Sequence, residues 1–215
     1  MQLYALSFIF WAAILLVFPA ASFACACCAE RGFYSIWTGK PNGYYLEVLK
    51  KIKFAQDAEL YLDAAGFDAI KGLESLTKNN SEIDLGIFNL TDSFKAKTWK
   101  LNFKAKNGKA GTLVLPLPAQ MLSFKVDIHD SNAETTNEPL LYKEWRFKGS
   151  VQTGNGFFQA GIVKPTTYFL VLQGRGNGCD NPEDFSHWRL EIDGRRADYA
   201  FFGKLSSGNL NVRQN

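Results

Sequence analysis

The sequence has no dense run of lysine and arginine, no charged side chain in its first 24 residues, and one cysteine outside an N-terminal cluster. Its 24 basic residues are interspersed with 21 acidic ones, which leaves a formal charge of +3. Proteins that follow phosphate backbones use concentrated basic stretches, so we expect no nucleic-acid partner. The sequence also lacks internal repeats, and 215 residues are enough for one domain with its own core.

The uncharged N-terminus has the pattern of an export signal. An apolar run over residues 6–18 ends at Pro19, and Ser22 and Ala24 place small residues where a signal peptidase reads. The run is shorter than the ~18–20 residues of a spanning helix, which favours cleavage over an uncleaved anchor. We therefore predict a signal peptide over residues 1–24 and one exported domain over residues 25–215, secreted or periplasmic.

Cysteines are confined to two places. Cys25, Cys27 and Cys28 open the predicted mature chain, and Cys179 stands alone in a distant glycine-spaced loop. Oxidising compartments favour disulfides, so we expect Cys179 to be bonded to Cys27 or Cys28. Lipidation of Cys25, giving a membrane-anchored lipoprotein, is the alternative for the first mature residue. Another alternative is a soft-metal or redox site formed by Cys25, Cys27 and Cys28, because thiolates bind Cu(I) and Zn.

Alternating apolar and polar residues dominate the rest of the chain and predict about ten short strands. We therefore expect a mainly β protein, an antiparallel β-sandwich with a β-barrel as the alternative. We predict inward side chains on each strand and outward ones between them, with Lys125, Asp127 and His129 among the outward group. The expected strands include residues 32–37, 44–54, 99–105, 113–117, 122–128, 141–147, 157–163, 168–172, 188–192 and 199–201.

The segment around Asn107-Gly108 is the strongest hairpin signal in the chain. A strict two-residue loop would put the leucines of the return strand on the wrong face. We therefore expect a bulged or three-residue loop that pairs Phe103 with Leu113 and Leu101 with Leu115.

No catalytic constellation stands out, so we expect a non-enzyme with no cofactor. Cys179, Asp184 and His187 have the residue types of a thiol nucleophile with its base, but a half-disulfide and a solvent-facing histidine explain them more simply. The acidic stretch 180–184 has oxygen ligands for Ca²⁺, yet its residue order is that of a helix start with Pro182 at the first position.

Two functions of different classes follow from these patterns. The first is a disulfide-tethered, non-catalytic binding or structural module whose partner is an unidentified ligand or envelope component. Its binding loop would present Arg175, Asn177, Asp180 and Asp184. The second is a cell-envelope metal-binding or redox protein that uses the N-terminal cysteines. Membrane contact is expected only through an uncleaved signal or a lipidated Cys25.

Overall fold

A computed structural model describes residues 27–61, 70–77, 86–128 and 140–206. The predicted signal peptide, Cys25 and His129 lie outside the described residues. None of the described helices is long and apolar enough to cross a membrane.

The protein is mainly β, as the alternation predicts, and its described residues form eleven antiparallel strands in one open sheet. Their order in the sheet is β1-β6-β7-β9-β10-β11-β2-β3-β4-β5-β8. The strands are β1 (Tyr34–Gly39), β2 (Phe54–Leu60), β3 (Ile87–Lys95), β4 (Thr98–Ala105), β5 (Ala110–Pro116), β6 (Met121–Asp127), β7 (Leu141–Ser150), β8 (Thr153–Gly156), β9 (Thr166–Gly176), β10 (Phe185–Gly194) and β11 (Ala197–Leu205).

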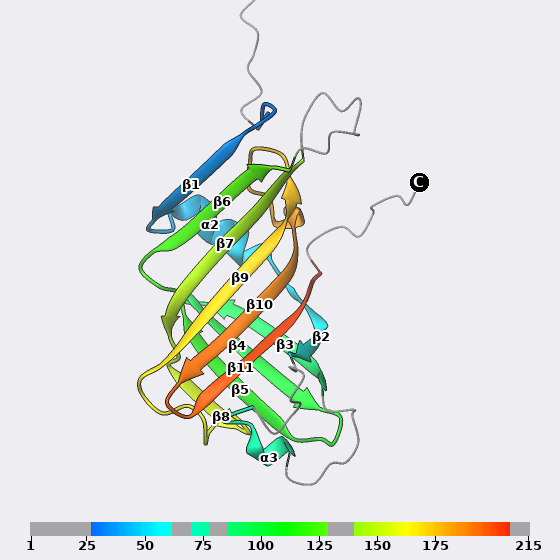
Figure 1. Ribbon diagram of the computed structural model, residues 1–215, viewed down its shortest axis with the longest axis vertical. Coiled ribbons are helices and arrows are strands. Elements are labelled where there is room, and N and C mark those ends of the chain that lie inside the picture. The colour runs from blue at the N-terminus through cyan, green and yellow to red at the C-terminus, as the bar shows by residue number, and fades with distance from the viewer. Residues whose placement is uncertain (1–26, 62–69, 78–85, 129–139, 207–215) are drawn as a thin grey trace, which may run out of the picture.

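The sheet folds over so that its two halves face each other across one core (Figure 1). The front half holds β1, β6, β7, β9, β10 and β11, and the back half holds β2, β3, β4, β5 and β8. Aromatic rings join the halves: Phe103 on β4 lies 4.6 Å from Phe201 on β11, and Trp99 lies 5.1 Å from Phe147 on β7. This is the sandwich arrangement, and the sheet remains open at β1 and β8.

A helix replaces the strand predicted for residues 44–54. Helix α2 (Gly43–Lys51) starts at Asn42, whose side chain accepts a hydrogen bond from the Tyr45 amide, and ends with Lys50 and Lys51. Asn42 thus satisfies an amide that would be unpaired at the start of the helix, and the two lysines lie at its negative end. Its buried side, Val48 and Leu49, packs into the shared core and fills space behind the front strands (Figure 1). Short helices α3 (Glu74–Thr77) and η3 (Pro182–Asp184) complete the fold.

Three further sequence expectations are corrected in detail. The β4–β5 hairpin has the predicted three-residue loop, residues 106–108, and buries the predicted face, but Leu101 pairs with Leu113 and Phe103 with Gly111. A side chain at Gly111 would meet the buried Phe158 ring at 2.8 Å, so this register makes room for that ring. Residues 157–163 form turns rather than a strand. On β6 the inner face is the opposite of the one predicted, as described below.

Candidate functional site

A disulfide fastens the start of the described chain to the loop between β9 and β10. Cys27 is bonded to Cys179, 152 residues away, with their Cα atoms 4.7 Å apart. The Gly178 amide also donates to the Cys27 carbonyl at 2.6 Å, and a side chain at Gly178 would approach that oxygen to 2.8 Å. The sequence left Cys27 and Cys28 as alternative partners; the structure selects Cys27 and leaves Cys28 exposed at the surface.

Two lysines lie side by side on the inner face beneath this loop. Lys125 on β6 is directly opposite Lys143 on β7 in the antiparallel register. The Lys143 side chain is fully buried, and that of Lys125 is 15% exposed. The prediction that Lys125 faces solvent is therefore wrong. Like charges opposite each other on one face destabilise a sheet, so this pair needs counter-charges.

Two carboxylates from the loop supply those counter-charges. Asp180 lies 2.9 Å from the Lys125 ammonium, and Asp184 lies 2.5 Å from the Lys143 ammonium. Lys143 is also 3.9 Å from the second oxygen of Asp180. We call these four residues the Lys–Asp cluster. Its formal charges cancel, which is the condition under which buried charges are tolerated.

Backbone carbonyls of the loop complete the coordination of both ammonium groups. Lys125 donates to the Gly178 carbonyl at 2.6 Å, and Lys143 donates to the Cys179 carbonyl. Burial lowers the pKa of Lys143 below its usual value, and its contacts with Asp184 and Asp180 oppose that shift. The cluster thus holds the loop that carries Cys179 against β6 and β7.

Helix α2 holds the same loop from another side. The Tyr44 hydroxyl donates to the Asp180 carbonyl and accepts from the Asp180 amide at 3.1 Å. Burial raises the pKa of Tyr44, so its hydroxyl stays protonated and able to donate. Next along the helix, Tyr45 contacts the Trp145 ring, which in turn packs on Phe185 at 4.6 Å. Aromatic packing therefore lies alongside the cluster and limits access of water to it.

The acidic stretch forms the predicted helix start. Asn181 is the N-cap of η3, Pro182 takes the first position, and the Asn181 amide donates to Asp184 at 3.0 Å. Two of its three carboxylates, Asp180 and Asp184, contact lysines, which leaves fewer oxygen ligands for a calcium ion. Within the described ranges, no three histidine, cysteine or acidic residues come together as metal ligands.

The residues of the predicted binding loop have different surroundings. Asp180 is buried and Asp184 half-buried, both in the Lys–Asp cluster, and the Asn177 side chain accepts from the Cys179 amide at 3.1 Å. Arg175 is the member that is exposed. The loop is thus held from within, and ligand binding by it stays a prediction.

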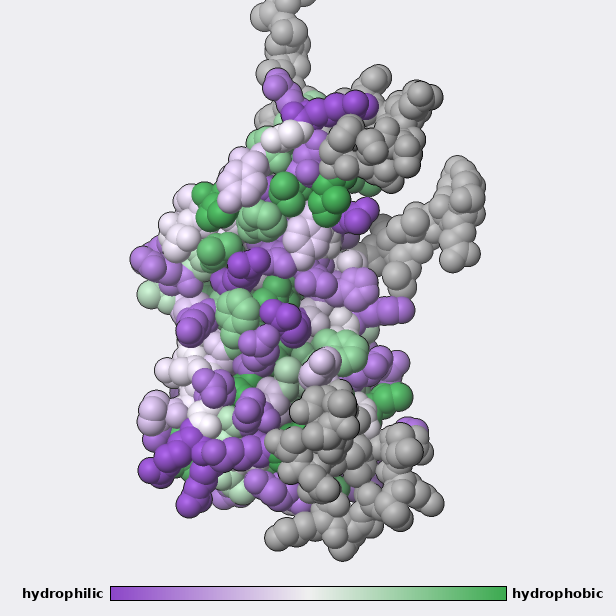
Figure 2. Space-filling view, viewed as in Figure 1, coloured by the Kyte–Doolittle hydropathy of each residue, from purple (hydrophilic) through white to green (hydrophobic). Residues whose placement is uncertain are grey.

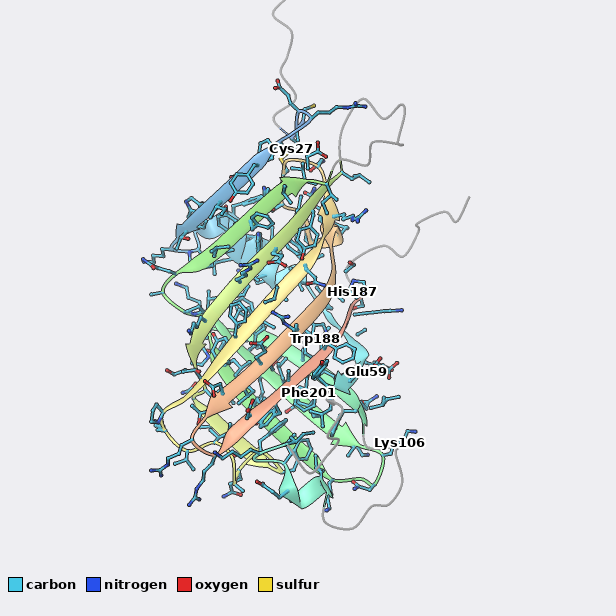
Figure 3. All side chains as sticks on the ribbon, in the orientation of Figure 1. Cys27, Glu59, Lys106, His187, Trp188 and Phe201 are labelled. Atoms are coloured by element: carbon cyan, nitrogen blue, oxygen red, sulfur yellow. A yellow bond between two sulfur atoms is a disulfide. The ribbon has the colours of Figure 1, made fainter. Side chains whose placement is uncertain are left out.

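The residues considered for thiol catalysis do not form a catalytic site. Cys179 is oxidised in the disulfide and has no thiolate to attack with. His187 is exposed on the outer face of β10, with its Nδ1 atom 2.8 Å from the Ser186 hydroxyl, and Figure 3 shows it well removed from Cys27. Because Cys27 is the other half of this disulfide, it cannot act as a thiolate ligand while the bond is intact.

A second feature, which sequence reasoning missed, is a basic surface on the back half of the sheet. Lys95, Lys97, Lys100 and Lys104 are all exposed on β3, β4 and the turn between them. We call these four the lysine face. Residues 86–117 contain six lysines and one acidic residue, a formal charge of +5, although the whole chain carries +3. That one acidic residue, Asp92, lies opposite the buried Leu101, on the inward side.

The positions between these lysines are uncharged and small. Asn89 is opposite Lys104, Ser93 is opposite Lys100, and Thr112 donates to Asn102 at 2.9 Å. Among the described residues, no carboxylate forms an ion pair with any of the four lysines. The basic charge of this surface is therefore not neutralised by the described part of the chain.

A hollow of about 380 Å³ adjoins the lysine face, between helix α2 and the β3–β4 turn. Leu46 and Phe94 supply its apolar lining, and Lys50, Lys95 and Lys97 its basic lining. Ala96 and Lys97 form the turn with φ values of 49° and 58°, a region that residues other than glycine seldom adopt. The turn thus projects Lys97 at some conformational cost.

Comparison of the chain with protein-family models, with curated proteins and with solved structures found no match.

Proposed function

We propose that this chain is an exported, non-catalytic binding module and that its lysine face binds an anionic component of the cell envelope. The observation that carries the proposal is that four lysines lie together on β3, β4 and their turn without an ion pair to any carboxylate of the described residues. In the sequence these lysines lie within residues 95–104, and the pairing of β3 with β4 places them on one surface. A field of one sign attracts an oppositely charged partner and speeds its association.

The outer faces of the two halves differ: in the back half the lysines occupy β3, β4 and their turn, and the exposed carboxylates of Asp57 and Glu59 lie on the neighbouring β2. The outer face of the front half mixes signs, with Glu144 paired to Arg146 and Glu191 paired to Arg189. The opposite charges of each pair cancel at short range, so this face produces little net electrostatic field. Electrostatics therefore favours one orientation on a negatively charged surface, with the back half of the sheet toward it.

The composition of the lysine face narrows the class of partner. The other outward residues around it on β3 and β4 are asparagine, serine and threonine, with the exposed Ile87 at the start of β3, and none is an aromatic ring on which nucleic-acid bases could stack. Lys100 and Lys104 stand four residues apart on one strand, about 13 Å between their Cα atoms, and such a spacing suits a surface of repeated anionic groups. We therefore infer that the partner is a surface of repeated anionic groups, such as lipid headgroups, and that several separate lysines bind it.

The internal fastening of the fold supports a binding role for a surface rather than chemistry at a centre. The disulfide and the Lys–Asp cluster fasten the β9–β10 loop to the start of the described chain and to β6 and β7. The lysines of the lysine face are held at set positions by the pairing of β3 with β4. Such preorganisation limits the entropy lost on binding.

The test is co-sedimentation of the oxidised protein with vesicles that contain or lack an anionic lipid. Replacing Lys100 and Lys104 by glutamate should weaken binding by at least about 30-fold, since each lysine near such a surface contributes about 1 kcal/mol. The matched control replaces Lys148 and Lys204, exposed on the front half, by glutamate and makes the same change in net charge. Equal binding by both variants, or equal binding to both kinds of vesicle, would refute the proposal.

A further inference from the structure

Strand β1 forms one edge of the sheet, and β6 is its one partner strand among the described residues. Edge strands are normally protected by charge, proline, a bulge or short length, because their free backbone groups pair readily with another strand. The opposite edge, β8, is only four residues long and half glycine. Strand β1 has six residues, YSIWTG, without charge or proline, and its register with β6 has no bulge.

One hydrogen bond establishes which backbone groups of β1 are free. The Asp127 amide donates to the Phe33 carbonyl at 2.8 Å, so the backbone groups of Phe33 point toward β6. Backbone direction alternates along an antiparallel strand. The N–H and C=O groups of Tyr34, Ile36 and Thr38 therefore point away from β6, at the open edge.

The side chains of the same three residues lie on the outer face of the sheet. Tyr34 is 62% exposed and Ile36 is 54% exposed, and the Tyr34 ring packs edge-on against Phe124 of β6. Figure 2 shows apolar surface continuing over the region of β1, β6 and β7. The open edge is thus bordered by exposed apolar side chains on its outer side.

We propose that β1 pairs antiparallel with β1 of a second copy of this chain, about a two-fold axis at Ile36. An axis normal to the sheet keeps outer side chains on the outer face in both copies. Residues that lie opposite each other across the axis must then both have their side chains on the outer face. This condition is met when Ile36 lies opposite Ile36 and Tyr34 lies opposite Thr38. In this register every outward backbone group of the three residues in each copy finds a partner.

A second copy fits this edge better than an unrelated strand for two reasons. The edge is uncharged, so two copies meet there without repulsion between side chains, although each chain carries a net charge of +3. It is also self-complementary, because its donors and acceptors are related by the same axis that relates the copies. The joined edge is only six residues long, and its area falls well short of the roughly 1,200–2,000 Å² of stable interfaces. We therefore expect a dimer that dissociates on dilution.

Sedimentation equilibrium and amide exchange over a range of concentrations test the dimer with the intact, oxidised protein. The amides of Tyr34, Ile36 and Thr38 should exchange rapidly when dilute and slowly when concentrated, whereas that of Trp37 should be protected at both concentrations. Ile36→Lys should abolish association, since it places two ammonium groups together at the axis. Phe202→Lys, which alters another exposed apolar residue on the outer face far from β1, should leave association unchanged.

Each contrary result has a distinct meaning. A protein that stays monomeric at all concentrations overturns the dimer. Association that survives Ile36→Lys shows that another surface is the interface. Protection of Tyr34, Ile36 and Thr38 in the dilute monomer shows that the chain covers its own edge, and this also overturns the proposal. Vesicle binding is measured separately, so failure here does not touch the proposed function.

Discussion

Replacing Cys27 by serine removes the one covalent link between the start of the described chain and the β9–β10 loop. The link joins residues 152 apart, and the chain-entropy relation for a loop of that length gives about 5 kcal/mol at 25 °C. The native fold retains the Gly178–Cys27 backbone bond and the Lys125–Gly178 contact. The main effect of the change is thus to free the unfolded chain, and we expect a loss of about 2–5 kcal/mol.

Guanidinium unfolding followed by tryptophan fluorescence measures this loss, because Trp99, Trp145 and Trp188 are almost fully buried and report on the core. Cys28→Ser is the matched control, the same exchange at the exposed neighbouring cysteine, and should unfold with the wild type. If Cys27→Ser also unfolds with the wild type, the tether does not contribute to stability and the reasoning from loop length is wrong. Limited proteolysis should in addition find cleavage before β1 in Cys27→Ser alone.

Replacing Lys143 by methionine should lower the unfolding free energy by about 3–5 kcal/mol in the same assay, because Asp184 then remains half-buried without its cation. A loss below 1 kcal/mol, roughly that of an exposed pair, would show that water reaches the cluster. Tyr168→Phe removes a hydrogen bond to the Pro116 carbonyl and should cost about 1 kcal/mol, whereas Tyr199→Phe removes a buried hydroxyl without a partner among the described residues and should be neutral or stabilising. Burial raises the pKa of both tyrosines in the folded protein. The stability linked to protonation of their hydroxyls is therefore fully present below about pH 10 and is lost as the pH rises further. The double phenylalanine variant should lose less stability between pH 9 and 11, as measured by unfolding at each pH, and an unchanged alkaline slope would contradict the assignment.

The strands could be predicted because one face of most of them is buried and the other is wet. Strand β7 shows this well, with Leu141, Trp145 and Phe147 buried in alternation. On β6 the same rule identified the strand and reversed its faces. Leu122, Phe124 and Val126 belong to the outer apolar surface next to β1, while Met121 and Ser123 point inward. Alternation reveals a strand, but it identifies the interior only where the outer face is polar.

Helix α2 was missed because two periodicities overlap in its sequence. Tyr44, Leu46 and Val48 alternate as in a strand, and this pattern drew the prediction. Tyr45, Val48, Leu49 and Ile52 repeat at helical spacing, and the last three of these are buried. The capping residue Asn42 was the signal that could have decided between the two patterns.

The candidate site was only partly visible in the sequence. The lone Cys179 pointed to its disulfide, but nothing near Lys143 in the sequence pointed to Asp184, 41 residues away. One signal was available: Lys143 falls at inward parity between Leu141 and Trp145. A lysine at such a position needs a buried partner, although the identity of that partner depends on how the loop folds back. Alternation on β4 already places Lys100 and Lys104 on one outward face, and the register of β3 with β4 was needed only to bring Lys95 alongside them.

The two proposed interactions reinforce each other through geometry. A two-fold axis normal to the sheet at β1 leaves the outer faces of both front halves on one side of the dimer. The lysine faces lie on the back halves, so both would be turned to the other side, toward the same surface. Two linked sites bind a repeated anionic surface more tightly than one, because the second contact forms at high effective concentration. A dimer too weak to persist in dilute solution would then be favoured where the anionic surface concentrates the protein.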